Sequence, residues 1–381
     1  MSFSNAIIYR ITIDPDRHSL ATLEDALHGQ RYVECTPTQE ESSGWVPPRG
    51  LEHGALAESI GGHWILRLMT ETRSVPGSVV SRKVDERVAQ IEQTTGRKPG
   101  KKERAEIKEN VKHELLPMAF SKQGATTVWI DPAAGLLVLD TSSMSRADAV
   151  VTALVTCMDG LAVSLVHTQH SPASSMAGWL NSQEAPSGFS IDREVELRAT
   201  DESKAVVRYA NHALDIDQVR EHVAGGKMPT RLAMTWDDRV SFQLTEGLTL
   251  RKIKFLEGVF EGKGDKEDEF DGDVAIFTGE LSGLIKDLVA ALGGEQEAAA
   301  PASIPASTTA VASTQPEAGN DDLYDKAVAV VLEHRKASIS LVQRYLQIGY
   351  NRAAGLLETM EERQVVSPMA ADGTRRLLKA A

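Results

Sequence analysis

The feature that most constrains the fold is a pair of short amphipathic segments near the C-terminus, within residues 338–368. Apolar residues recur at helical spacing on both sides of a break at Ile348–Gly349. Ser338 is placed to cap the first helix, and the second helix is expected to run from about Tyr350 to Gln364. Two helices joined by a tight, glycine-containing turn predict a helix-turn-helix, in which the second helix is the candidate recognition helix.

The second helix of this pair has an apolar face and a polar face. A strand, a turn at residues 371–374 and a returning strand are predicted to follow it. A hairpin in this place is the wing of a winged helix, and Arg375 and Arg376 on it could contact DNA phosphates. The alternative is a small three-helix domain used for protein contact. The apolar face consists of Ala353, Leu356, Leu357 and Met360, and the polar face of Asn351, Gly355, Glu358 and Glu362, flanked by Arg352.

The run ASISLVQRYLQIGYNRAA, at residues 337–354, resembles the gamma domain of the FtsK and SpoIIIE DNA translocases. The resemblance covers residues 321–378 and implies a winged helix that reads short, oriented, G-rich sites in double-stranded DNA. It also implies base contacts from Asn351 and Arg352, backbone contacts from Gln343 and Arg344, and a groove-facing position at Glu358.

One position departs from the gamma-domain pattern. That family usually has arginine after NRAA, where this chain has Gly355. The missing guanidinium removes a guanine contact or a phosphate contact, so the sequence preference is expected to be weak. Gamma domains also contact the XerD recombinase. The resemblance therefore leaves open an adaptor, whose C-terminal domain binds a tyrosine recombinase or another protein partner rather than DNA.

The chain has 381 residues, a net charge of −13 and two cysteines that lie far apart, Cys35 and Cys157. This length accommodates two or three domains with a sizeable core. The cysteine usage favours the reducing cytoplasm, and no apolar run is long enough to span a membrane. The net charge taken alone disfavours a nucleic-acid partner. DNA responds to charge within about 10 Å, however, so the local distribution of charge matters more than its sum.

The most basic stretch lies within a long charged segment at residues 79–116, which is predicted to be helical with a break near residues 96–100. Two apolar stripes, one on each side of the break, indicate two helices. The segment is either a solvated helix pair with internal ion pairs or a basic tip that faces DNA. The basic residues closest to the break are Arg97, Lys98, Lys101, Lys102 and Arg104.

Strand and helix patterns mix irregularly over residues 1–295, which predicts an α+β fold with largely antiparallel sheet. Residues 274–278 are predicted to form a strand and residues 279–292 a closing helix. Residues 296–320 are rich in Ala, Pro, Ser and Thr and predict a flexible linker that spans about 25–30 Å on average. The predicted organisation is a mixed domain, this linker, and a small winged-helix domain at residues 321–381.

Four motifs within residues 1–295 occur in order, GWVPP, LLPMAFS, TVWID and FTGELSGLI, and are similar to the recombination-associated RdgC family. The resemblance implies a non-enzymatic, largely sequence-independent binder of double-stranded DNA. Two subunits of that family close into a ring that encircles the duplex and opposes RecA filaments. The resemblance also implies that Phe120 lies at a ring-closing subunit contact and that the basic residues before it line or flank the hole.

In the RdgC family, a finger after the strand that reads VVR here (residues 206–208) usually has a Lys-Lys-Gln-like tip. This chain has Arg208 there, followed by Asn211 and His212, so the phosphate contact of the finger is expected to be weaker.

No Walker A, HExxH or GxSxG motif and no zinc-ligand set is present, so no ATPase activity and no cofactor or metal is expected. A metal-dependent nuclease built on carboxylates such as Asp192, Glu194 and Glu196 is a distant alternative. The combined hypothesis is a cytoplasmic, nucleoid-associated homodimer. Its ring would hold the DNA backbone and restrain RecA-dependent recombination, and its tethered winged helix would supply a preference for sequence or orientation.

Overall fold

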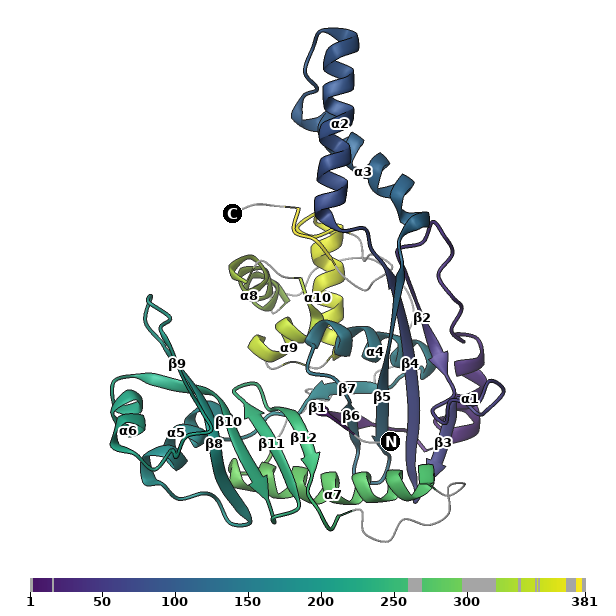
Figure 1. The fold of residues 1–381 in the computed structure, drawn as a ribbon. Helices are drawn as coiled ribbons and strands as arrows, with labels where there is room; N and C mark the ends of the chain where they lie inside the picture. The colour runs from purple at the N-terminus through teal and green to yellow at the C-terminus, as the bar shows by residue number, and fades with distance from the viewer. Residues whose placement is uncertain are drawn as a thin grey trace.

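The computed structural model describes residues 3–15, 17–259, 269–296, 320–334, 337–346, 348, 350–367 and 375–378. Most of the predicted linker lies outside the described residues, and so does the turn predicted at residues 371–374. The described chain is a mixed α and β structure built on an antiparallel sheet, with a winged helix at its C-terminal end, as predicted (Figure 1).

The sheet of the described residues has twelve strands, in the order β2-β4-β5-β6-β1-β12-β11-β10-β8-β9, with β3 paired to β4 and β7 paired to β1. Adjacent strands are antiparallel throughout. The strands are β1 Asn5–Thr12, β2 Glu41–Val46, β3 Ala57–Ile60, β4 His63–Arg73, β5 Ser121–Asp131, β6 Leu136–Leu139, β7 Ala162–Leu165, β8 Phe189–Ala199, β9 Val206–Ala210, β10 Lys227–Trp236, β11 Val240–Thr245 and β12 Thr249–Phe255.

Strand β1 joins the two halves of the sheet. Ile7 pairs with Leu139 of β6 on one side and with Thr249 of β12 on the other. Successive side chains of a strand point to opposite faces, so the two faces of β1 belong to different cores. Ile7 and Tyr9 lie in one buried apolar cluster, and Ile8 lies in the other.

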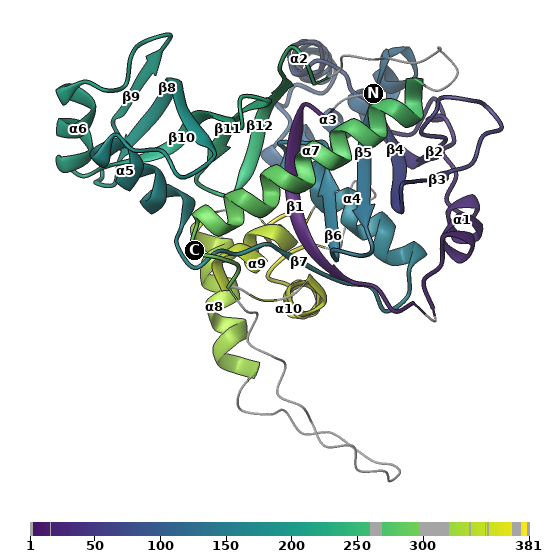
Figure 2. The same cartoon turned by 90° about the horizontal axis from the view of Figure 1, so that it is seen from below.

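A long helix, α7, crosses beneath the sheet (Figure 2). The strand predicted at residues 274–278 is wrong, because these residues lie inside α7. Val274, Phe277 and Leu281 are buried at helical spacing, and this apolar stripe outweighs the strand-like local composition. The helices are α1 Leu20–His28, α2 Gly77–Thr95, α3 Lys101–Leu115, the 3-10 turn η1 Leu116–Met118, α4 Met144–Cys157, α5 Pro172–Ser182, α6 Asp217–Ala224, α7 Glu269–Ala291, α8 Asn320–Glu333, α9 Ile339–Leu346 and α10 Tyr350–Glu362.

Helices α2 and α3 form a hairpin that projects from the sheet between β4 and β5 (Figure 1). The predicted break is confirmed, because α2 ends at Gly96, which adopts a left-handed conformation with φ of 69°. Val80, Val84 and Val88 of α2 pack with residues of α3 in a small apolar cluster of their own. The hairpin therefore carries its own core away from the sheet.

The predicted helix-turn-helix is confirmed as α9 and α10, and α8 packs against both (Figure 1). The predicted apolar face of α10 is buried. The strand pairing of the wing is present, since Val366 bridges Leu377 and the Ser367 N–H donates to the Arg376 carbonyl at 2.7 Å. We refer to α8, α9, α10 and this hairpin as the C-terminal module, and to residues 3–296 as the body.

Glu71 lies on β4, the strand that leads into the α2–α3 hairpin, and binds the loop that contains Tyr32 and Cys35. Its buried carboxylate accepts hydrogen bonds from the Tyr32 hydroxyl at 2.6 Å and from the Cys35 N–H at 2.7 Å. Hydrogen bonds from Ser121, Tyr32 and Cys35, in this order of effect, lower the pKa of Glu71 to about 2.

We predict that Glu71→Gln makes the stability of the protein less sensitive to acid. A pKa below the ordinary value of 4.5 means that Glu71 contributes stability above about pH 4.5, which is lost as the pH falls towards 2. Urea unfolding over a pH series should show a lower unfolding free energy for the variant at pH 7 and a flatter acid limb. The exposed Glu202→Gln is the control. An acid limb as steep as that of the unmodified protein would contradict the assignment.

Candidate nucleic-acid interface

The tip of the α2–α3 hairpin carries cations that the fold leaves free. Arg97 pairs with Glu103 and Arg104 pairs with Asp85. Lys98, Lys101 and Lys102 are exposed, and no ion pair forms between them and any described residue. The predicted basic tip is thus partly neutralised within the hairpin. The cations it presents are three lysines on a projecting element.

A second basic cluster lies in the middle of the β8–β9 hairpin, which we call the finger. The strand register places Arg208 of β9 and Arg231 of β10 on either side of Glu196 of β8. Arg208 Nε donates to Glu196 Oε2 at 2.9 Å, and Nη atoms of Arg198 and Arg231 lie 3.6 and 3.8 Å from carboxylate oxygens of Glu196. The carboxylate is buried, whereas the Arg208 side chain is 61% exposed. Three guanidinium groups therefore share one negative charge.

Arg198 and Arg231 were not identified from the sequence. The two arginines lie on separate strands, far apart in the sequence. Only the strand pairing shows that they lie near the same carboxylate. Burial opposes the ionised form of Glu196, but hydrogen bonds from Thr230 and Arg208 and the nearby arginine charges outweigh it and lower the pKa of this carboxyl. The carboxylate thus stays ionised and orients the guanidinium groups.

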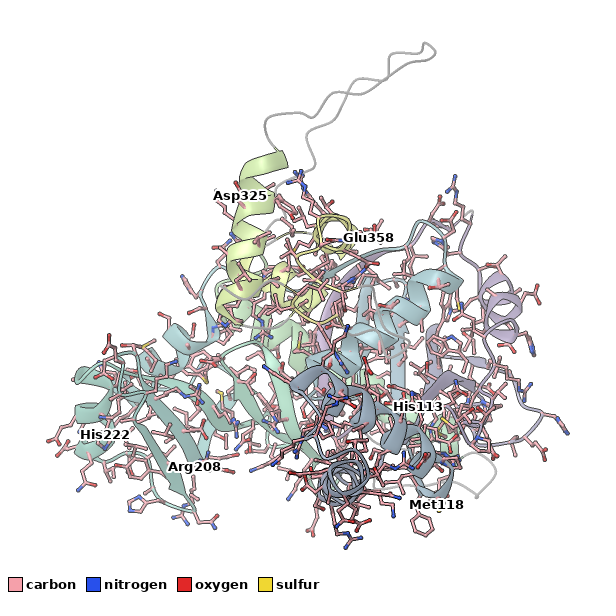
Figure 3. All side chains as sticks on the ribbon, turned by 90° about the horizontal axis from the view of Figure 1, so that it is seen from above. His113, Met118, Arg208, His222, Asp325 and Glu358 are labelled. Atoms are coloured by element: carbon pink, nitrogen blue, oxygen red, sulfur yellow. The ribbon has the colours of Figure 1, made fainter. Side chains whose placement is uncertain are left out.

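The residues expected at a finger tip, Asn211 and His212, follow β9 at the end away from the turn that joins β8 to β9. Asn211 adopts a left-handed conformation with φ of 54° directly after β9. The His212 ring lies 5.7 Å from the Tyr209 ring. Figure 3 places Arg208 and the α2–α3 hairpin towards the same edge of the body, and the C-terminal module towards the opposite edge.

Two large apolar side chains stand exposed at the foot of the hairpin. Phe120 is 96% exposed and Met118 is 71% exposed. Exposed apolar side chains that lie next to each other mark a candidate contact with another surface. The structure thus gives Phe120 no part in the core of its own chain, so core packing, the usual role of an aromatic side chain, does not explain this residue.

The C-terminal module presents some of the predicted DNA contacts and covers others. Arg344, Arg352, Glu358 and Arg376 are exposed. Gln343 is 0% exposed, which removes it from any backbone contact in this arrangement. The Arg375 side chain is only 7% exposed and pairs with Glu361 at 3.2 Å, so it stabilises the module instead of reaching outwards. The side chain of Asn351 lies outside the described residues.

Gly355 lies on α10 in a position open to larger side chains. A Cβ atom placed there would meet no atom within 4 Å. The helix therefore does not require glycine at this position for packing. The fold would therefore accommodate an arginine at position 355.

The carboxylates considered for a nuclease are each engaged. Asp192 accepts from the Thr235 hydroxyl at 3.0 Å, Glu194 pairs with Lys252 at 2.9 Å, and Glu196 holds the arginine cluster. No group of three or more potential metal ligands occurs among the described residues. Among those residues there is also no helix with the length and apolarity needed to cross a membrane.

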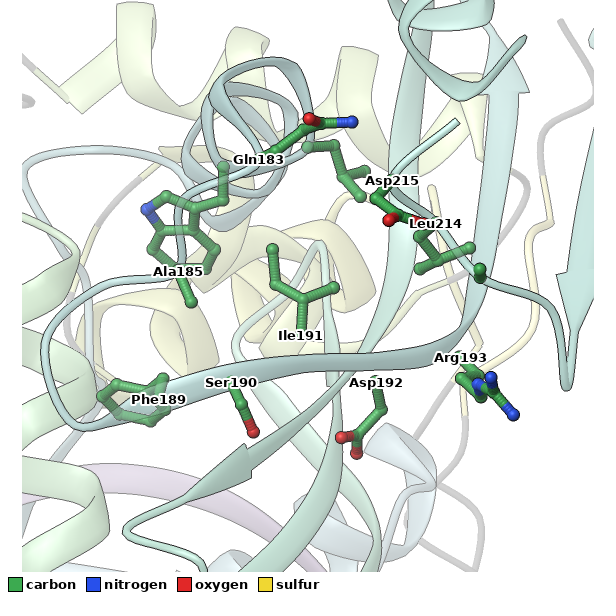
Figure 4. Close-up of a pocket in the computed structure, with 12 residues that line it drawn as sticks. Gln183, Ala185, Phe189, Ser190, Ile191, Asp192, Arg193, Leu214 and Asp215 are labelled. Atoms are coloured by element: carbon green, nitrogen blue, oxygen red, sulfur yellow. The ribbon is translucent and has the colours of Figure 1, made fainter. Parts of the chain in front are cut away.

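A cavity of about 470 Å³ lies between α5 and the start of β8 (Figure 4). Its apolar lining includes Trp179, Phe189 and Ile191, and Asp192 and Asp215 add polar groups. Burial raises the pKa of Asp192, against the effect of the Thr235 hydrogen bond. No sequence pattern pointed to this cavity, whose walls come from residues 179–193 and 213–215.

Residues 1–295 match the family model described as "Putative exonuclease, RdgC". The chain belongs to the RdgC family. Residues 318–380 match the model described as the FtsK gamma domain, a winged helix. Both resemblances read from the sequence are thereby confirmed.

Curated relatives carry the name "Recombination-associated protein RdgC". The protein of Janthinobacterium sp. (strain Marseille) is 43% identical over 301 residues, which cover 78% of this chain and 99% of that protein. Those of Dechloromonas aromatica (strain RCB) and Herminiimonas arsenicoxydans are 41% and 42% identical and are covered over 98% and 99% of their lengths. The relatives are thus covered almost completely, whereas this chain is longer than they are. Because the RdgC match ends at residue 295, the extra residues of this chain lie in its C-terminal part.

Proposed function

We propose that this RdgC-family protein binds double-stranded DNA without cleaving it and acts in recombination. The observation that carries the proposal is the placement of cations on one side of an acidic chain. The α2–α3 hairpin, whose tip carries three free lysines, and Arg208, which shares Glu196 with Arg198 and Arg231, lie towards the same edge of the body (Figure 3). Contacts of this kind with phosphates supply affinity that does not depend on sequence.

The body acts in this proposal as one half of a dimeric ring. The exposed Phe120 and Met118 supply an apolar contact at the foot of the hairpin, whose other end is the basic tip. A contact there joins two subunits beside the DNA-binding surface, so that the duplex is encircled. A protein that encircles DNA obstructs a recombinase filament on the same DNA, which is the basis for the proposed restraint of RecA.

The C-terminal module supplies the preference for sequence or orientation. Arg352 and Glu358 of α10 are exposed, as a recognition helix requires. The residues between 296 and 320 tether the module, which makes its engagement with DNA intramolecular once the body has bound. Even a module weakened by glycine at position 355 can then bias where the ring resides.

We predict that replacing Lys98, Lys101 and Lys102 together by alanine weakens DNA binding and its salt dependence. Each lost phosphate contact should reduce the slope of log K against log salt by about 0.9. Fluorescence anisotropy with a random duplex over a salt series measures this. Lys286→Ala, an exposed lysine on α7 at the other end of the body, is the control. An unchanged slope in the triple variant would remove the tip from the interface.

Shortening of the duplex during incubation with Mg²⁺ would contradict a non-enzymatic role.

We further predict that Phe120→Ala weakens the dimer. A buried aromatic anchor at an interface contributes about 2 kcal/mol or more, which corresponds to an increase of about 30-fold in the dimer dissociation constant. Sedimentation over a dilution series measures this constant, with Val33→Ala, at another exposed apolar side chain, as the control. Equal dissociation constants for Phe120→Ala and the unmodified protein would show that the subunits meet elsewhere.

A further inference from the structure

The helix-turn-helix of the C-terminal module is packed against the body. Helix α9 contacts α4 and β7, and α10 also contacts β7 (Figures 1 and 2). One apolar cluster contains body residues such as Val151 and Leu154 together with module residues such as Val342 and Leu357. The module thus shares a hydrophobic core with the body, although about two dozen residues of chain separate the two.

Two polar contacts fix the register of this packing. The Ser338 hydroxyl, at the start of α9, donates to Asp148 Oδ2 of α4 at 2.7 Å. The guanidinium of Arg344 lies so close to Gly247, in the β11–β12 turn, that a Cβ atom there would be only 3.0 Å away. Arg344 and Gly247 line a common cavity with His167 and Gln296, the last described residue of the body. We call the body surface formed by α4, β7 and Gly247 the seat.

The packed arrangement also carries a penalty. Gln343 of α9 is 0% exposed, and neither its Oε1 nor its Nε2 has a hydrogen-bond partner among the described residues. A buried amide without partners is unfavourable, since it gives up hydrogen bonds to water. A rearrangement of α9 that exposed Gln343 to water would remove this penalty.

The packing conflicts with the way in which a helix-turn-helix binds DNA. The second helix of such a motif lies in the major groove while the first crosses the backbone, so both need the duplex beside them. Here the body contacts both helices. On α9, which should cross the backbone, Gln343 is buried and Arg344 packs beside Gly247. Arg352 and Glu358 of α10 remain exposed, so the conflict lies at α9. The module also lies at the edge of the body opposite the hairpin and Arg208 (Figure 3). A duplex held at the basic edge is therefore not beside the seated module.

We propose that the seat is a binding surface for the C-terminal module of this chain, and that the body and DNA compete for the helix-turn-helix. The part of this inference in which DNA is the competitor rests on the proposed function. In the seated module α9 is not free to cross the DNA backbone, so the apparent affinity of the module for a preferred site is its intrinsic affinity multiplied by the fraction of molecules in which it is unseated. The ring binds first, and a preferred site then draws the module off the seat.

The first test measures binding of the full chain to a duplex that carries an oriented G-rich site, relative to a random duplex. Asp148→Ala removes a hydrogen bond to a charged group, so the preference for the oriented duplex should rise by about tenfold. Ser338→Ala should have a similar effect, and the two together should give little more than either alone. Asp159→Ala, which removes a nearby exposed aspartate beyond α4, is the charge control. An unchanged or reduced preference in both variants would overturn the competition.

The second test examines the seat without DNA, so that it can fail separately from the proposed function. Hydrogen exchange of the full chain should rise at β7 and at the seat-facing part of α4 in Asp148→Ala, and should not rise in Asp159→Ala. Unchanged exchange in Asp148→Ala would overturn the seat itself. Raised exchange, with no variant preferring the oriented duplex, would confirm the seat and refute DNA as its competitor.

Discussion

The structure depends on the pairing of one N-terminal strand. Strand β1 hydrogen-bonds to β6 on one side and to β12 on the other, and without it the sheet would separate into two parts. The alternation of its side chains supplies both cores, with Ile7 and Tyr9 on one face and Ile8 on the other. The hairpin with the free lysines and the finger with the arginine cluster lie in different halves of the sheet, so β1 sets the distance between the two basic surfaces.

The distribution of charge explains how a chain with a net charge of −13 can have a basic face. Arg97 and Arg104 at the hairpin are balanced by acidic neighbours, whereas three adjacent lysines are not. At the finger, Glu196 holds three arginines and leaves two positive charges in excess. The overall charge therefore says little about the face that a polyanion would meet.

Strong periodicity made some parts of the fold predictable. The break between the helices of the hairpin, the buried face of α10 and the hairpin of the wing all follow from local patterns that the packing did not override. Residues 274–278 were mistaken for a strand because five residues are too few to tell a buried helix from a strand. The role of Arg375 could not be seen either, since its partner Glu361 lies across the module. The seat and the arginine cluster depend on contacts between distant segments, which no local pattern records.

The central claim is that the body holds DNA without regard to sequence while the module reads it. Binding of a random duplex and of a duplex with an oriented G-rich site, measured over a salt series, tests this most directly. The full chain is compared with a form that ends after Glu295, a length close to that of the matched relatives. The account predicts salt-sensitive binding by both forms and a preference for the oriented duplex only in the full chain. Equal affinities unaffected by truncation would assign the module to a protein partner, and failure of both forms to bind either duplex at low salt would contradict the account.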